Sequence, residues 1–485
     1  MVPAQSERLV RPLARISVRT ARSEHKPVVT LLMTESNLKE DGAAASIKPV
    51  QPLFGSLASG VAVTFTTRLI ILCCVIGSSV IVAHWLGPEG TGALAVLNVT
   101  AALALQLGSA GIPSATTYFV ARDRKLAAPI WADGLVFSLA AGTLIALVVI
   151  VIATARPTLF NGVPVGLIIV VAISIPFQLV TLLGLNLLLA VDRIRLMNVL
   201  DALSSFLVLL NAIGVLVLWR RNLTTLVYFN QAATVIVSLI VIGFLARLNR
   251  RAGAKGFDAS LLKRMLGYGL KFYVCIFAGF IIFRLDLLIV NRFRGAQDAG
   301  VYAIASQFSF LLIMLPGVIA SLLFPRVASH DEPAGYAIEV TRHTSFVMLI
   351  VCLGAALASF ALPLVYGARF ADATIQFLIL LPGVFFISLE SVLVQYFTGT
   401  GLPALIPWFW IITVAVNVGL NLALVPAYGA RAAALNSTIS YGLIFLLVAV
   451  YFGRRTDHNP LLVFAPRAGE LWTLIAKLQR RAGAK

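Results

Sequence analysis

The chain has 485 residues, of which 59% are hydrophobic and only 12% charged. Soluble globular domains carry about 25% charged residues, so this composition excludes an ordinary soluble protein. The net charge of +18 comes from basic residues that gather between the apolar stretches, in segments that we assign to one face of a membrane. That distribution fits topology and contact with anionic membrane lipids, and it gives no support to a nucleic-acid partner.

The first 55 residues differ in composition from the rest of the chain. Five arginines recur every three or four residues, which would place them on one face of a helix: Arg8, Arg11, Arg15, Arg19 and Arg22. A surface-lying amphipathic helix and a transit peptide are both compatible with this pattern. We expect a disordered cytoplasmic segment at 1–55. Whether translation starts at Met1 or at Met33 stays open.

Long apolar stretches follow, and each is long enough to cross a bilayer, which takes roughly 20 residues of helix. Runs this continuous indicate helices rather than the alternating strands of a barrel. We predict an all-α polytopic membrane protein with twelve spans, near residues 57–86, 91–120, 130–155, 165–190, 196–219, 226–246, 267–291, 299–325, 343–366, 371–396, 404–425 and 432–453. Most Lys and Arg then lie on the cytoplasmic side, together with both termini.

The chain repeats itself at a nearly constant offset, which indicates two pseudo-symmetric six-helix lobes. The matched pairs are Gly87 with Gly295, Gly92 with Gly300, Ala95 with Ala303, Pro176 with Pro382 and Asn211 with Asn421. Because each half has an even number of spans, both enter the membrane in the same sense and meet at a central cleft. We therefore expect an N-lobe at 56–246, a cytoplasmic linker at 247–266, a C-lobe at 267–453 and a basic cytoplasmic tail at 454–485. Whether the tail adds further membrane helices stays open.

Prolines within the spans predict interrupted helices. A proline removes one hydrogen bond and clashes with the preceding turn. We expect breaks at Pro113, Pro176, Pro316 and Pro382, and breaks at matched positions of two halves are typical of a transporter's binding site. A packing kink is the alternative for each.

Charges within the spans provide the candidate site. A charge at mid-bilayer is costly and normally faces a wet cavity or a partner. Arg68, Lys271 and Arg284 predict a cationic cleft that suits a phosphate. Asp286 and Glu390 are the candidates for binding a coupling ion. A salt bridge between helices for Arg284 and Asp286, and snorkelling for Lys271, remain alternatives.

Catalytic machinery is not evident in the sequence. It contains no P-loop pattern, no Asp-x-Asp pair in a loop and no His/Cys/Asp cluster with metal-ligand spacing. The four cysteines lie in predicted spans without such spacing. We therefore expect no cofactor, no metal, no catalytic residue and no enzymatic activity.

Three segments together resemble a known family. They are Leu86-Gly-Pro-Glu-Gly-Thr-Gly92, Arg284-Leu-Asp-Leu-Leu-Ile-Val-Asn291 with the following Gly295-Ala-Gln-Asp-Ala-Gly-Val-Tyr-Ala303, and Asn421-Leu-Ala-Leu-Val-Pro-Ala-Tyr-Gly-Ala-Arg-Ala-Ala-Ala434. In order and spacing they are similar to the Wzx-type oligosaccharide-lipid flippases of the multidrug/oligosaccharidyl-lipid/polysaccharide exporter superfamily. The resemblance covers about residues 53–455 and excludes the N-terminal segment. Family members often have fourteen spans, two more than we count here.

The resemblance implies a function. It implies alternating access by two six-helix lobes and translocation of an undecaprenyl-pyrophosphate-linked oligosaccharide across the bacterial inner membrane. The resemblance is also compatible with contact between this chain and a polysaccharide polymerase or other assembly proteins. The glycan, the coupling ion and the oligomeric state stay open.

Three other classes of membrane protein are alternatives to this function. A multidrug exporter of the same superfamily usually carries an acid in its first span, where this chain has Arg68. A lipid II flippase typically adds two helices. A membrane glycosyltransferase or ligase would need catalytic acids on a large external loop, and none of the predicted outside loops is large.

Overall fold

A computed structural model describes residues 54–251, 257–329, 332–401 and 403–464, and nearly all of the predicted 1–55 segment lies outside these ranges. The regular elements of the described ranges are all helices, as predicted. The α-helices are α1 (Phe54–Ser109), α2 (Ile112–Arg122), α3 (Ala127–Ala155), α4 (Val165–Ala190), α5 (Ile194–Asn211), α6 (Leu223–Arg251), α7 (Ala259–Ser329), α8 (Pro333–Ala358), α9 (Leu362–Tyr366), α10 (Ala371–Gly399) and α11 (Leu405–Thr456).

Nine helices in the described part of the chain are long and apolar enough to cross a membrane. The predicted count of twelve is not confirmed, because three of the nine, within α1, α7 and α11, have 44, 48 and 52 residues. Each of these contains one glycine with non-helical backbone angles, namely Gly87, Gly295 and Gly429. At 1.5 Å per residue, a straight helix of that length would reach about twice the thickness of a bilayer core.

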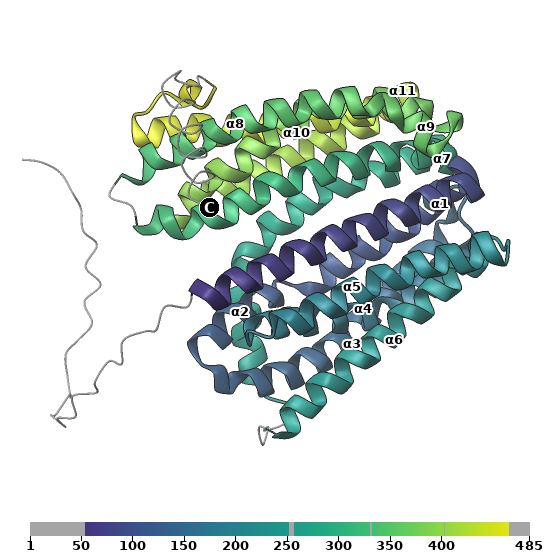
Figure 1. Cartoon of the computed structure of the whole chain (residues 1–485), viewed down its shortest axis with the longest axis horizontal. Coiled ribbons are helices and arrows are strands. Elements are labelled where there is room, and N and C mark those ends of the chain that lie inside the picture. The colour runs from purple at the N-terminus through teal and green to yellow at the C-terminus, as the bar shows by residue number, and fades with distance from the viewer. Residues whose placement is uncertain (1–53, 252–256, 330–331, 402, 465–485) are drawn as a thin grey trace, which may run out of the picture. The chain divides into compact units, whose positions relative to one another are not determined.

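The helices fall into two groups that meet along α1 and α7. Helices α3–α6 lie on the α1 side, and α8, α10 and α11 lie on the α7 side (Figure 1). The largest cluster of buried apolar side chains draws on both groups, with Val96 and Leu97 from α1 and Val290, Tyr302 and Ala305 from α7. The two long helices therefore form the packed seam between the groups.

Two glycines allow α1 and α7 to approach closely at this seam. A Cβ atom at Gly92 would lie 1.7 Å from the carbonyl oxygen of Ala296, and one at Gly300 would lie 1.9 Å from the carbonyl oxygen of Pro88. Any side chain larger than hydrogen would therefore overlap with backbone atoms of the other helix. Gly92 and Gly300 are one of the pairs that the internal repeat matched, and the structure places them in contact.

One proline lies at a helix interruption. Pro113 lies in the first turn of α2, just after Ala110 and Gly111, which have φ angles of 45° and 75°. There Gly111 touches the backbone of Gly269 in α7, since a Cβ at Gly111 would lie 2.5 Å from the Gly269 carbonyl oxygen. The hydroxyl of Tyr273, also in α7, donates to the carbonyl oxygen of Gln106 at 2.7 Å and more weakly to that of Leu107 at 3.2 Å.

The other three predicted breaks are wrong as interruptions, because α4, α7 and α10 continue through Pro176, Pro316 and Pro382. A proline removes only one hydrogen bond, which neighbouring helices can compensate. Near Pro382 the Thr438 hydroxyl of α11 donates to the carbonyl oxygen of Ile379 at 2.6 Å; Ile379 follows Leu378, whose carbonyl loses its helical donor to the proline.

The predicted polar linker at 247–266 is shorter than expected. Helix α6 extends to Arg251, and α7 already begins at Ala259. Leu261 and Met265 are 1% and 0% exposed and belong to an apolar cluster with side chains of α2, α3, α4 and α6. The backbone N–H of Asp258 also donates to the carboxylate of Asp133 in α3, at 2.7 Å. The start of α7 thus packs into the first group of helices.

Candidate functional site

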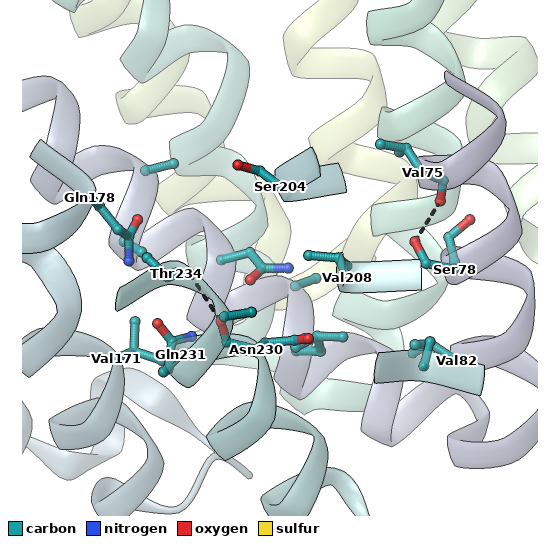
Figure 2. A pocket seen from close by; sticks show the side chains of 18 of the residues that line it. Val75, Ser78, Val82, Val171, Gln178, Ser204, Val208, Asn230, Gln231 and Thr234 are labelled. Carbon is teal, nitrogen blue, oxygen red and sulfur yellow. Dashed lines mark hydrogen bonds between the residues drawn. The ribbon is translucent and has the colours of Figure 1, made fainter. Parts of the chain in front are cut away.

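A cavity of about 600 Å³ opens within the first group of helices, at its border with α7. Side chains from α1, α4, α5 and α6 line most of it, and Ala303, Ile304 and Gln307 of α7 complete it. In Figure 2, Gln178, Asn230 and Gln231 lie on the α4 and α6 side of this space, opposite Ser78 of α1. The volume falls within the range of sites that hold drug-sized ligands.

The polar lining is entirely uncharged. None of the lining residues carries a formal charge or an aromatic ring. The polar ones bear hydroxyl or amide groups, and they are Ser78, Ser79, Thr91, Asn98, Gln178, Thr181, Ser204, Asn230, Gln231, Thr234 and Gln307. This site was missed by the sequence reasoning, which looked for charges. Neutral amides that recur in otherwise apolar spans were the available signal.

Hydrogen bonds orient the amides on the α4 and α6 side. Ser174 of α4 accepts from Gln178 Nε2 at 2.8 Å and donates to Gln231 Oε1 at 2.6 Å. Asn211 donates from its amide to Asn230 Oδ1 at 3.1 Å. Each of the three cavity amides is therefore held through one of its two polar atoms.

The α7 side of the cavity is tied to the second group of helices. Gln307 Nε2 donates to the Ser79 hydroxyl of α1 at 3.3 Å, and that hydroxyl lies 2.8 Å from the Tyr366 hydroxyl of α9. Movement between the two groups of helices would therefore change one wall of the cavity.

Two of the three predicted cationic residues lie outside this cavity. Arg68 forms an exposed salt bridge with Asp201 of α5 at 2.9 Å. Arg284 of α7 is partly buried, and its guanidinium carbon lies 4.6 Å from the ring centre of Phe310. Neither lines the cavity. The side chain of Lys271 lies outside the described part of the structure, so the three are not brought together in what the structure describes.

The two predicted acids are buried in the second group of helices. Asp286, 2% exposed, accepts hydrogen bonds from the Tyr302 hydroxyl, from the Ser437 hydroxyl at 3.0 Å and from the backbone N–H of Leu287 at 2.7 Å. The structure describes no ion pair between Asp286 and Arg284. Glu390 is 3% exposed, and its Oε1 has no hydrogen-bond partner among the described residues.

A network of asparagines lies beside Asp286 and was only partly visible in the sequence. Within α11, Asn417 donates to Ser440 at 3.0 Å, Asn421 donates to Asn417 and Asn436 donates to Asn421 at 3.3 Å. Ser437, whose hydroxyl donates a hydrogen bond to Asp286, is the next residue after Asn436 in the sequence. Asn421 is the repeat partner of Asn211, whose amide donates to Asn230 in the other half, and it begins the third segment that resembles the family; neither pattern indicated this network.

The long apolar helices define the chain as a multi-pass membrane protein. Proteins of known structure share its fold. An inward-facing multidrug resistance MATE family transporter of the MOP superfamily aligns with a TM-score of 0.62, covering 81% of this chain and 98% of that one at 15% identity. The lipid II flippase MurJ in an inward closed conformation aligns with a TM-score of 0.63, covering 87% and 96% at 14% identity. At these identities the likeness establishes the fold alone.

Residues 81–375 match the polysaccharide biosynthesis protein family, and the chain belongs to that family. It is also 26% identical over 363 residues to the succinoglycan biosynthesis transport protein ExoT of Rhizobium meliloti (strain 1021), which covers 72% of this chain and 69% of that protein. The chain is thus a multi-pass membrane protein of a polysaccharide biosynthesis family, and it has the fold of the MOP superfamily transporters.

Proposed function

We propose that this protein translocates a lipid-pyrophosphate-linked oligosaccharide across the bacterial inner membrane by alternating access. The observation that carries the proposal is the uncharged polar cavity within the apolar helix bundle of a polysaccharide biosynthesis protein. A sugar that crosses a membrane needs hydrogen-bonding groups at a depth where lipid offers none. The cavity lining contains no carboxylate or aromatic ring, which disfavours an exporter of organic cations.

The same proposal includes twelve crossings in two six-helix lobes, at 56–246 and 267–453, with both termini and the linker in the cytoplasm. The lengths of α1, α7 and α11 support it, because each is about twice what one crossing needs and contains one non-helical glycine at which the chain can reverse. Reporter fusions at Gly295 and at residue 256 are expected on opposite sides of the membrane, and equal sidedness would contradict this topology.

Arg284 is the proposed partner of the pyrophosphate, with Arg68 and Lys271 in support. What favours Arg284 is its environment: it is partly buried in a span and stacked on Phe310, with no described salt bridge. A planar guanidinium can donate two parallel hydrogen bonds to a phosphate, which a lysine cannot. Arg68 already has Asp201 as its partner, so its contribution requires that exposed pair to open.

Asp286 and Glu390 are the proposed coupling sites. Both side chains are buried: Asp286 accepts hydrogen bonds from the hydroxyls of Tyr302 and Ser437, and Glu390 has one oxygen without a partner among the described residues. Binding a cation there would remove a costly buried charge and bias the two lobes between inward and outward states.

One flux assay tests these roles. The full chain is reconstituted in vesicles with a fluorescent polyprenyl-pyrophosphate disaccharide, and imposed proton or sodium gradients drive transport. We expect Arg284→Ala to abolish flux and Arg284→Lys to retain part of it, while Asp286→Asn binds the lipid but ignores the gradient. Wild-type vesicles that do not move the lipid under any gradient would contradict the proposed function. Full flux by Arg284→Ala would contradict only the role of that arginine.

A further inference from the structure

Asn98 lines the cavity from the part of α1 that follows Gly87, and its amide has no hydrogen-bond partner among the described residues. Its neighbours Leu97 and Val99 are buried, whereas Asn98 itself is exposed and lines the cavity. Its side chain makes no hydrogen bond to any described residue. An asparagine within a membrane span is costly unless it meets water or a ligand, so its groups are available for one.

The opposite wall of the cavity has hydrogen-bond donors and acceptors that have no described partner. Gln178 uses its Nε2 on Ser174 and leaves its carbonyl oxygen, while Gln231 and Asn230 use their oxygens and leave their NH₂ groups. The cavity therefore presents at least two spare amide donors and one spare acceptor, besides the whole amide of Asn98. A ligand that fits must both donate and accept over its surface.

The absence of charge in the lining restricts the ligand further. A pyrophosphate or an acidic sugar would carry negative charge into a site where no lining residue is cationic, and an unpaired charge is expensive to bury. An acyl chain would leave the amides unpaired. An uncharged sugar has hydroxyl groups that both donate and accept hydrogen bonds. It therefore pairs with the amides and brings no charge into the cavity.

We infer that this cavity binds an uncharged sugar unit of the transported glycan, through the amides of Asn98, Gln178, Asn230 and Gln231. The inference rests on the proposed function and deepens it: the glycan and the pyrophosphate occupy separate places, the first between α1, α4 and α6 and the second at Arg284. The four amides of the cavity thus select for sugar hydroxyls, whereas Arg284 recognises the pyrophosphate, the part common to every lipid-linked glycan.

Binding measurements on the full chain in nanodiscs test this assignment. Three probes share one polyprenyl pyrophosphate: the first carries a neutral hexose disaccharide, the second a disaccharide of the same size with one uronic acid, and the third no sugar. We expect wild type to bind the neutral probe about tenfold more tightly than the other two, since two or three neutral hydrogen bonds supply a preference of that order.

The decisive variant is Asn98→Leu, which keeps the branching at Cγ, removes both polar atoms and breaks no described hydrogen bond. It should lose the preference for the neutral probe and keep wild-type affinity for the sugar-free one. Gln178→Met is a second variant with the same expectation. Asn186→Leu is the matched control, because Asn186 lies on α4 outside the lining and donates only to the Leu182 carbonyl of its own helix, so it should bind like wild type.

Four results would overturn the assignment. Two concern Asn98→Leu: retention of the full preference, or an equal loss of affinity for all three probes. The third is a wild type that binds the acidic probe as tightly as the neutral one. Each of these contradicts the sugar site and leaves the proposed function standing. The fourth is a wild type that binds none of the three lipids, which contradicts the proposed function and this inference with it.

Discussion

Replacing Gly92 with alanine should force α1 and α7 apart. The added Cβ would lie 1.7 Å from the Ala296 carbonyl oxygen and 2.7 Å from the Gly300 nitrogen, where ordinary contacts begin at 3.4 Å. The neighbours are backbone atoms and cannot rotate away, so the helices must separate locally by about 1.5 Å. Overpacking of this kind costs about 1–3 kcal/mol.

The expected result is a shift between conformations as well as lower stability. If the contact belongs to one state of the transport cycle, then 1–3 kcal/mol of strain lowers that state's population relative to the others by roughly 5- to 150-fold. Spin labels at the exposed residues Glu89 and Gln297, in a cysteine-free background, would report the separation of the two helices by pulsed electron resonance. The variant should show a longer distance and reduced export of glycan.

Gly243→Ala is the control for this experiment. Gly243 also lies inside a long helix, but a Cβ there meets nothing within 4 Å, so alanine should be neutral or mildly stabilising through its better helix propensity. If Gly92→Ala matches wild type in distance distribution, melting temperature and export, the close backbone approach at this seam is not a feature of the working protein.

Two further predictions concern hydrogen bonds at the ends of helices. Tyr273→Phe removes the hydroxyl that donates to the Gln106 carbonyl at the interruption before α2, and should lower stability by about 0.5–1.5 kcal/mol; an unchanged melting temperature in detergent would contradict this. Asp258 precedes α7 and accepts from the Ser260 hydroxyl and backbone, which holds the pKa of its carboxyl below the usual value. Its stabilisation is therefore present above the unfolded pKa of about 3.9, and the melting-temperature deficit of Asp258→Ala at pH 7 should fade as the pH falls below about 4; a deficit that grows in acid would refute the cap.

The helical architecture was predictable because long apolar runs admit few alternatives in a bilayer. The glycine pairs of the repeat also proved informative, since Gly87 and Gly295 are non-helical and Gly92 and Gly300 touch. The prolines were less informative. At Pro382 the helix continues, and a threonine of another helix donates to a carbonyl one turn earlier, a contact between residues 59 apart in sequence. The sequence around a proline does not show such contacts with another helix.

The candidate site was predicted less well than the fold, for a related reason. A charge in a span suggests a functional site because burying it costs free energy, but that cost falls once the charge has a partner. Asp201, the partner of Arg68, lies 133 residues away in the sequence. Neutral amides such as Asn98 and Gln231 cost less free energy to bury, so they are a weaker signal in the sequence. Only the assembled helices show that they line one cavity. The cavity is a property of helix packing, which no single span encodes.

The placement of the first turns of α7 has a consequence for biosynthesis. Leu261 and Met265 complete an apolar core whose other members, such as Trp131 and Val241, precede the linker in the chain. During co-translational insertion, the first six predicted spans would therefore enter the membrane before Leu261 and Met265 can fill their places in this core. The resulting gap in the packing would close only when the second half begins to insert. A gene split before Ala259 would leave that gap open until the second fragment docked, so we expect the first fragment alone to be a substrate for membrane proteases. The two halves resemble each other in sequence, but we expect the earlier one to complete its packing only when the start of the later one is present.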